Sequence, residues 1–210
     1  MATRQSAPVS AAVEGLTDEA VLRRLVSEAE GAVDTVYGKQ GKSYLRHRIA
    51  GYNNAARFSP WVVLVDLNAE EECAPALRRV WLPKPTSNMC FRVAVRATES
   101  WLLADPERLA SYLGIRRSLV PRNPDDLDRP KEAVVELARR SRRRAIREDM
   151  VPRPDSGRRI GPAYTSQLVQ FVGDRVKGWR PAVAAHRSDS LRRCLQRIAE
   201  LVGLWRTAGA

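Results

Sequence analysis

Cysteine is scarce in this chain of 210 residues, and the three present are Cys73, Cys90 and Cys194. Their number is odd, they are scattered, and none stands in a CxxC or Cys/His spacing. This pattern argues against a zinc site and against a framework of disulfides, and it fits a reducing cytoplasm.

Long apolar runs are also missing. No stretch approaches the roughly 18 to 20 apolar residues that a membrane span requires, although hydrophobic residues make up 44% of the chain, enough for a sizeable core. The segment from Met1 to Ser6 lacks the charged region and apolar core of a signal peptide. We therefore expect a cytoplasmic globular protein with no membrane partner.

Two catalytic patterns are absent as well. The chain holds no GxxxxGK[ST] sequence, so we expect no nucleotide-binding P-loop. The two histidines, His47 and His186, stand apart from any Ser or Cys nucleophile motif, which argues against a hydrolase triad.

Positive charge, by contrast, is in excess. Of 36 basic residues 31 are arginine, and against 24 acidic residues they leave a net charge of +12. Residues 1–70 hold eight basic and eight acidic side chains, so the whole excess lies in residues 71–210. Such a basic field attracts polyanions, nucleic acid above all. The competing interpretation is that a GC-rich genome supplies arginine whatever the function.

Strand and helix patterns alternate up to about residue 114, which predicts a mostly parallel sheet with helices on both faces. Prolines 121, 124 and 130 then mark an irregular link, after which the pattern is helical. We expect a single α/β unit, with a core over 1–120 and a helical C-terminal extension over 121–210 packed on it. The expected strands are 9–14, 32–37, 61–66 and 90–96, and the expected helices include 43–57, 70–81, 99–114 with a new cap at Asp105-Pro106, 130–147, 164–177 and 189–206.

The main candidate for a metal ligand stands at the end of the expected strand that begins at Trp61. A run of β-branched and apolar residues that stops at an acid is typical of a buried parallel strand. It would deliver Asp66 to the carboxyl edge of the sheet, where open α/β folds bind ligands. The first strand ends at Glu14, and Glu99 and the acidic run 70–72 follow strands too. Converging carboxylates of this kind suit Mg²⁺ or Mn²⁺, and such a metal polarises a phosphodiester.

Each of these acids also has a structural interpretation. An acid after a strand is more often a helix cap. We expect Asp18 and Glu19 to favour a helix N-terminus rather than to bind metal. Glu99, directly after a potential cap at Thr98, is as easily explained in the same way. Tyr164 is expected in the core rather than stacked on a base.

Three groups of basic residues are candidates for phosphate contact. Lys131 stands at the start of an expected helix, where a cation gains nothing from the dipole, and Lys39 and Lys42 lie in a glycine loop. The segment 139–147, expected on a helix, has six arginines in nine residues, and guanidinium groups grip phosphate with a fork of donors. The alternatives are plain solvation and an acidic protein partner. The arginines of this run predicted to bind nucleic acid are Arg139, Arg140, Arg143 and Arg144.

Two short motifs carry a resemblance. Val13-Glu14-Gly15-Leu16-Thr17-Asp18 resembles the first motif of TOPRIM domains, and Val65-Asp66-Leu67-Asn68 resembles their Asp-x-Asp strand end. More narrowly, the chain resembles a small bacterial TOPRIM-like family catalogued as domain of unknown function four-two-seven-six. The segments that carry this likeness run in order along nearly the whole chain: 13–19, 63–75, 93–105 with its Glu-x-Trp-Leu-Leu-Ala-Asp signature, 128–131, 161–164 and 188–191.

The resemblance implies a TOPRIM-type sheet and Mg²⁺-dependent phosphodiester chemistry on DNA or RNA. It also suggests an ATPase partner, since TOPRIM nucleases of the overcoming-lysogenization-defect type work with one in phage defence. By position, Glu14 would be general acid/base or metal ligand, and Asp66 the principal ligand. Glu99 and Lys131 complete the expected catalytic set. The expected metal ligands are Glu14, Asp66, Asn68 and Glu70.

Asn68 departs from the TOPRIM pattern, which has a second Asp at that position. A neutral amide leaves one unit of metal charge uncompensated, so metal should bind more weakly unless Glu70, Glu71 or Glu99 substitutes. A second hypothesis follows, in which a catalytically degenerate TOPRIM-like module only binds a protein partner or nucleic acid. A primase-like polymerase is a third, but no nucleotide-binding loop favours it.

Overall fold

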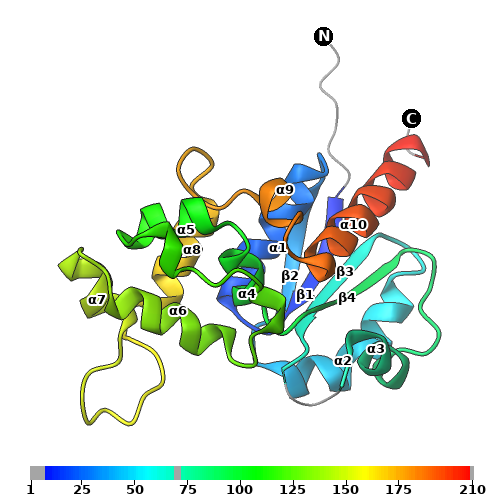
Figure 1. Ribbon diagram of the computed structural model, residues 1–210. Helices are drawn as coiled ribbons and strands as arrows, with labels where there is room; N and C mark the ends of the chain where they lie inside the picture. The colour runs from blue at the N-terminus through cyan, green and yellow to red at the C-terminus, as the bar shows by residue number, and fades with distance from the viewer. Residues whose placement is uncertain (1–7, 69–71, 209–210) are drawn as a thin grey trace.

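A four-stranded, all-parallel sheet forms the centre of the computed structural model, which describes residues 8–68 and 72–208. The strand order is β2-β1-β3-β4, and Figure 1 shows the sheet flanked by helices. The expected α/β fold with a parallel sheet is therefore confirmed. The strands are β1 (Pro8–Val13), β2 (Ala32–Gly38), β3 (Trp61–Asp66) and β4 (Met89–Ala94).

Both faces of the sheet are buried. Alternate side chains of each strand point to opposite faces, and the side chains on each face belong to a separate core. In β3, Val62 and Leu64 join a core on one face, whereas Val63 and Val65 join a second core on the other. The first core includes side chains of α1 (Leu16–Glu28) and α10 (Asp189–Ala208), and the second includes side chains of α2 (Lys42–Ala55) and α3 (Ala74–Trp81). Continuous apolar strands such as β3 are the expected sequence for a sheet covered on both sides.

The order of the strands creates a switch point between β1 and β3. The chain leaves β1 for the edge strand β2 through α1, on one face, and leaves β3 for the other edge strand β4 through α3, on the opposite face. Connections that diverge in this way leave a crevice at the carboxyl ends of the two central strands, which is where open α/β sheets bind ligands.

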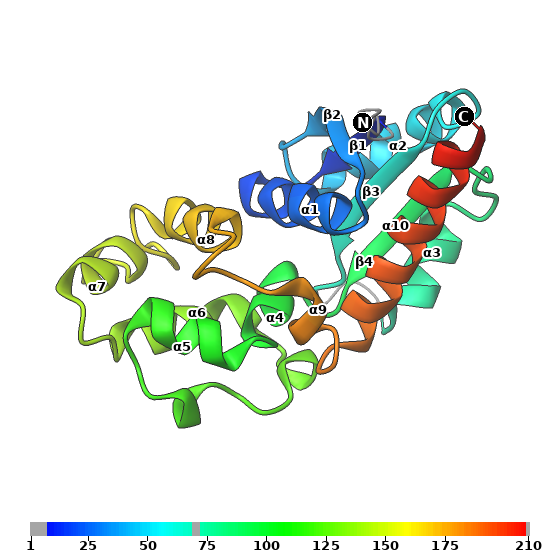
Figure 2. The same ribbon diagram turned by 90° about the horizontal axis from the view of Figure 1, so that it is seen from above.

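The remaining helices form a group beside the sheet and share the larger core with α1 and α10. Figure 2 shows α5 to α8 in this group. Its elements are α4 (Thr98–Leu103), α5 (Pro106–Leu113), η1 (Arg117–Leu119), η2 (Pro124–Asp126), α6 (Pro130–Arg139), α7 (Arg144–Met150), α8 (Tyr164–Gly173) and α9 (Pro181–Ala184).

Several helix boundaries differ from those expected. The helix expected over 70–81 begins only at Ala74 in the described residues, and the helix expected to 177 ends at Gly173. The helix expected over 99–114 is two helices, and Asp105 caps the second by accepting a hydrogen bond from the Arg108 N–H at 3.4 Å, as expected for a residue before proline.

The largest correction concerns the arginine run. It does not lie on one helix, because α6 ends at Arg139 and α7 begins at Arg144. The hydroxyl of Ser141 accepts a hydrogen bond from the Arg143 N–H at 2.9 Å and donates one to the carbonyl of Leu113. Serine side chains that bind nearby backbone in this way compete with helix formation, so the prediction of one continuous helix is wrong at this position.

Within the described ranges, none of the helices is both long and apolar enough to cross a lipid bilayer.

A buried ion pair ties the helical group together. Asp105 is fully buried and accepts hydrogen bonds from Arg180, from its N–H at 3.1 Å, its Nε at 2.9 Å and its guanidinium at 2.7 Å. The same guanidinium pairs with Glu107 at 2.8 Å, but the Glu107 side chain is 60% exposed. One arginine thus contacts a buried acid and an exposed acid, so substituting each acid in turn compares a buried with an exposed ion pair.

We predict that Asp105→Ala lowers the free energy of unfolding by about 2–4 kcal/mol, since it removes the buried acceptor of three Arg180 hydrogen bonds and the cap of α5. Glu107→Ala should cost less than about 1 kcal/mol, as for an exposed ion pair. Urea denaturation of both variants measures the difference, and equal losses would show that burial does not decide the strength of this pair.

Candidate functional site

Glu14 and Asp66 meet at the switch point of the sheet. Glu14 follows β1 and Asp66 ends β3, and these neighbouring strands pair in register, with Val13 opposite Leu64. The Asp66 N–H donates a hydrogen bond of 2.7 Å to Oε1 of Glu14. Both side chains are partly buried and line a cavity of about 260 Å³. The structure thus brings together the two acids that the sequence placed at this edge.

A chain of hydrogen bonds adds a third acid, Asp18. The Thr98 N–H at the start of α4 donates to Oδ1 of Asp66 at 2.9 Å, and the Thr98 hydroxyl donates to Oδ1 of Asp18 at 2.7 Å. The other oxygen of Asp18 accepts from the Gly15 N–H at 2.9 Å, which caps α1. Asp18 is 8% exposed and lines the same cavity. The helix-terminal role expected for Asp18 is confirmed, but its side chain also belongs to the site.

Glu99 is the fourth carboxyl group of the cavity and is only 2% exposed. Its Oε1 accepts a hydrogen bond from the Tyr164 hydroxyl at 3.3 Å and lies 3.6 Å from Nζ of Lys131. Its Oε2 is buried and has no hydrogen-bond partner among the described residues. The Lys131 side chain is 54% exposed, so its ammonium reaches both the cavity and solvent.

Burial, with neighbouring negative charge adding to it, raises the pKa values of Asp18 and Asp66. Burial raises the pKa of Asp18 to about 6, with the Thr98 hydrogen bond opposing and the charge of Glu99 adding to the effect. Burial, followed by the charges of Asp18, Glu99 and Glu14, raises the pKa of Asp66 well above its usual range. The charge of Glu99 raises the pKa of Lys131. Four carboxyl groups and one ammonium line the cavity.

The oxygen donors suit a hard divalent cation better than any other metal. Among the described residues, no three side chains of His, Cys, Asp or Glu are placed so that they could hold one metal ion together. Mg²⁺ is commonly held by only one or two carboxylates, with water and substrate phosphate as its other ligands. An excess of carboxylates and the unpartnered oxygen of Glu99 are compatible with a site of that kind.

The other expected metal ligands are less well placed. Asn68 lies just beyond Asp66 with a left-handed backbone (φ 52°), which asparagine tolerates better than most residues. It is exposed and lines, with Asp66 and Lys131, a neighbouring cavity of about 420 Å³. Glu70 and Glu71 lie outside the described residues.

Two of the basic residues expected to contact phosphate lie near the edge of the sheet but have protein partners. Nζ of Lys39 pairs with Glu19 at 3.1 Å, and Nζ of Lys42 donates to the carbonyl of Leu67 at 3.0 Å. Of the residues expected to bind nucleic acid, Lys131 alone lines the carboxylate cavity.

The arginine run is separate from this site. It begins at the end of α6 opposite to Lys131. Arg139 pairs with Glu136 at 3.2 Å and Arg144 with Glu148 at 2.7 Å, and Arg143 donates to the carbonyl of Tyr112 at 3.0 Å. Arg140 is exposed. The structure therefore does not join these arginines to the acids.

Sequence reasoning missed Thr98 and Tyr164 as partners of the acids. Thr98 is expected only as a cap for its own helix, and Tyr164 as a core residue, with base stacking as the alternative. Tyr164 lies 65 residues from Glu99 along the chain, so no local spacing signals the contact.

Comparisons with protein-family models, curated proteins and solved structures gave no match to the chain. Its function is therefore inferred from the cavity and from its short motifs.

Without metal, the contribution of Asp18 to stability should fall as pH rises. Asp18 has a pKa of about 6 when folded and 3.8 ordinarily, so the folded protein holds this proton more tightly than the unfolded chain does. Its contribution is present below about pH 4 and is lost as pH rises through 6, by roughly 3 kcal/mol. The raised pKa of Asp66 acts in the same direction.

We predict that Asp18→Asn flattens this decline. Asparagine resembles the protonated carboxyl group, since its Oδ1 can accept from the Gly15 N–H while its Nδ2 donates to the Thr98 hydroxyl. The variant should therefore be about as stable as the wild type at pH 4 and more stable at pH 8. Urea denaturation with EDTA between these pH values measures the effect, with the exposed Asp34→Asn as control. A decline as steep in Asp18→Asn as in the wild type would contradict the assignment.

Proposed function

We propose that this protein is a metal-dependent nuclease, or the nuclease-like subunit of one, of TOPRIM-like type that acts on phosphodiesters of DNA or RNA. The observation that carries the proposal is the gathering of Glu14, Asp18, Asp66 and Glu99 with Lys131 around one cavity at the switch point. A cleft with surplus carboxylate and a single exposed cation suits an anionic substrate only when a divalent metal offsets the charge.

In this proposal Asp66 and Glu14 hold Mg²⁺ or Mn²⁺, which when bound polarises the scissile phosphate and offsets the charge that develops on transfer. Glu14, held through Oε1 by the Asp66 N–H, is either a second ligand or the acceptor of the proton from the attacking water. Lys131, half exposed and paired with Glu99, contacts a non-bridging phosphate oxygen. Thr98 fixes Asp66 and Asp18 through its N–H and hydroxyl.

The proposed ATPase partner and role in anti-phage defence rest only on the resemblance to nucleases of the overcoming-lysogenization-defect type. Cleavage by the purified chain alone would identify an autonomous nuclease. Cleavage only after an ATPase is added would identify a subunit.

We predict cleavage of DNA or RNA that requires Mg²⁺ or Mn²⁺ and that falls about 100-fold or more in Asp66→Asn and Glu14→Gln, as expected when an electrostatic group of the transition state is lost. Gel assays with both nucleic acids measure the rates. Glu136→Gln, an exposed acid at the far end of α6, is the matched control.

Loss of activity through unfolding can be separated from loss of chemistry. Asp66→Asn keeps an acceptor for the Thr98 N–H and removes a crowded charge, so it should melt no lower than the wild type at pH 8. Undiminished cleavage in both site variants would rule out this site. Absence of cleavage in the wild type together with metal-dependent cleavage by Asn68→Asp would favour the degenerate binding module, because asparagine stands where TOPRIM domains have an acid.

A further inference from the structure

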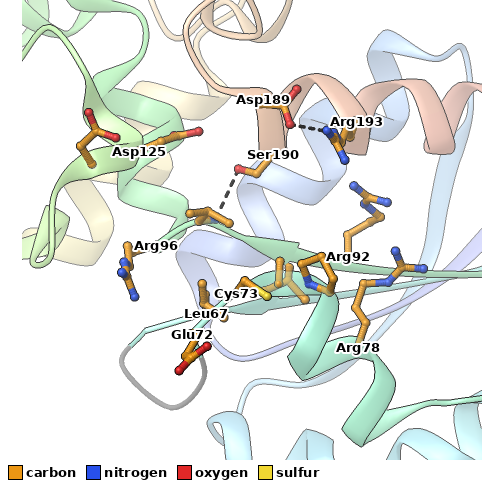
Figure 3. A pocket seen from close by; sticks show the side chains of 15 residues that line it. Leu67, Glu72, Cys73, Arg78, Arg92, Arg96, Asp125, Asp189, Ser190 and Arg193 are labelled. Carbon is orange, nitrogen blue, oxygen red and sulfur yellow. Dashed lines mark hydrogen bonds and ion pairs between the residues drawn. The ribbon is translucent and has the colours of Figure 1, made fainter.

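A larger cavity of about 570 Å³ lies at the open edge of β4, between α3 and α10. We call it the arginine pocket, after Arg78 on α3, Arg92 on β4, Arg96 just beyond β4 and Arg193 on α10, which all line it. Figure 3 shows the side chains of Arg78, Arg92 and Arg193 on the same side of this pocket. Three separate elements thus supply positive charge to one side of the pocket, which is also lined by the acids Glu72, Asp125, Asp126 and Asp189.

Two of these arginines have no acidic partner among the described residues. Arg193 pairs with Asp189 at 2.7 Å, and Arg96 donates to the carbonyl of Asn68 at 3.2 Å. Within residues 8–68 and 72–208, no ion pair holds Arg78 or Arg92, and Nε of Arg92 is buried without a hydrogen-bond partner. A buried guanidinium donor without an acceptor is costly, so this end of the pocket favours an anion.

The surroundings of Arg92 do not supply that anion. The nearby thiols are Cys90 and Cys194, and burial raises the pKa of both, that of Cys90 to about 11, so neither is ionised at neutral pH. Burial, and then the positive charge of Arg92, lower the pKa of Arg78. The two guanidinium groups therefore repel one another in the unliganded protein, and a bound anion would offset that repulsion.

The opposite end of the pocket presents an acceptor. Oδ2 of Asp125 accepts a hydrogen bond from the Ser188 hydroxyl at 2.9 Å, whereas Oδ1 is buried and has no partner among the described residues. In Figure 3, Asp125 lies across the pocket from Arg78 and Arg92. Two residues that each hold a buried polar atom without a partner among the described residues, Arg92 and Asp125, thus line one cavity from its two ends.

We propose that the arginine pocket binds a nucleotide, with its phosphate on Arg78 and Arg92 and an N–H group of its base on Asp125. Guanidinium groups bind phosphate oxygens in pairs, and a carboxylate oxygen accepts from an amino group of a base. The volume lies in the range of about 300–1,000 Å³ that small-ligand pockets occupy. The nucleotide is either free or the phosphorylated end of a nucleic acid chain.

Calorimetric titration tests this site with adenosine 5′-monophosphate, adenosine, inorganic phosphate and a 5′-phosphorylated oligonucleotide. Adenosine monophosphate should bind at least about tenfold more tightly than adenosine, because a charge-assisted contact is worth about 1.5–3 kcal/mol. Arg78→Gln should weaken its binding about tenfold or more. Arg79→Gln, the exposed neighbour on α3 that does not line the pocket, should bind as the wild type does.

Asp125→Asn tests the other end. It should weaken binding of adenosine monophosphate but leave that of inorganic phosphate unchanged. Tight binding of the oligonucleotide that Arg78→Gln weakens and Asp66→Asn does not assigns the pocket to chain ends, and tight binding of the mononucleotide alone assigns it to a free ligand. Equal affinity for adenosine and its monophosphate, or equal binding by Arg78→Gln and Arg79→Gln, would overturn the proposal. Asp66→Asn should not change nucleotide binding, so failure here is distinct from failure of the proposed nuclease.

Discussion

The confinement of four carboxyl groups at the carboxyl edge of a parallel sheet is the constraint on which the rest of this structure depends. Glu14 and Asp66 come from neighbouring strands, and Asp18 and Glu99 come from the first turns of the helices α1 and α4. Hydrogen bonds from the Asp66 N–H, the Thr98 N–H and the Gly15 N–H offset part of the repulsion. Lys131 offsets a further part at 3.6 Å from Glu99. The remaining excess of negative charge is the basis on which we propose that the cavity binds a divalent cation.

The topology explains why the acids can be held so close. Because the connections from β1 and β3 diverge to opposite faces, they leave a crevice between the ends of these strands. The shared larger core then brings α4, α6 and α8 to its rim, and with them Glu99, Lys131 and Tyr164. The arginine pocket lies at the neighbouring edge strand β4. The two cavities are therefore built on the same sheet, but none of the four acids of the carboxylate cavity lines the arginine pocket.

Much of the fold could be predicted from the sequence because it depends on local patterns. The apolar run before Asp66 and the strand that ends at Glu14 place both acids at one edge, and Glu99 and Lys131 were also expected in the site. Contacts between distant segments had no such signal. The bond between Thr98 and Asp18 spans 80 residues, and Arg78 and Arg92 belong to different elements. The break in the arginine run depends on one serine hydroxyl that binds the end of α5, which periodicity does not reveal.

The most direct test of the account is a calorimetric titration of Mg²⁺ and Mn²⁺ into the purified protein at pH 8, where Asp18 is ionised. The account predicts saturable binding that weakens as pH is lowered to 5, because crowded carboxyl groups then take up protons instead of metal. Asp66→Asn should abolish this binding. No binding by the wild type at millimolar metal, or equal binding by the wild type and Asp66→Asn, would contradict the claim that the carboxylate cavity is a divalent cation site.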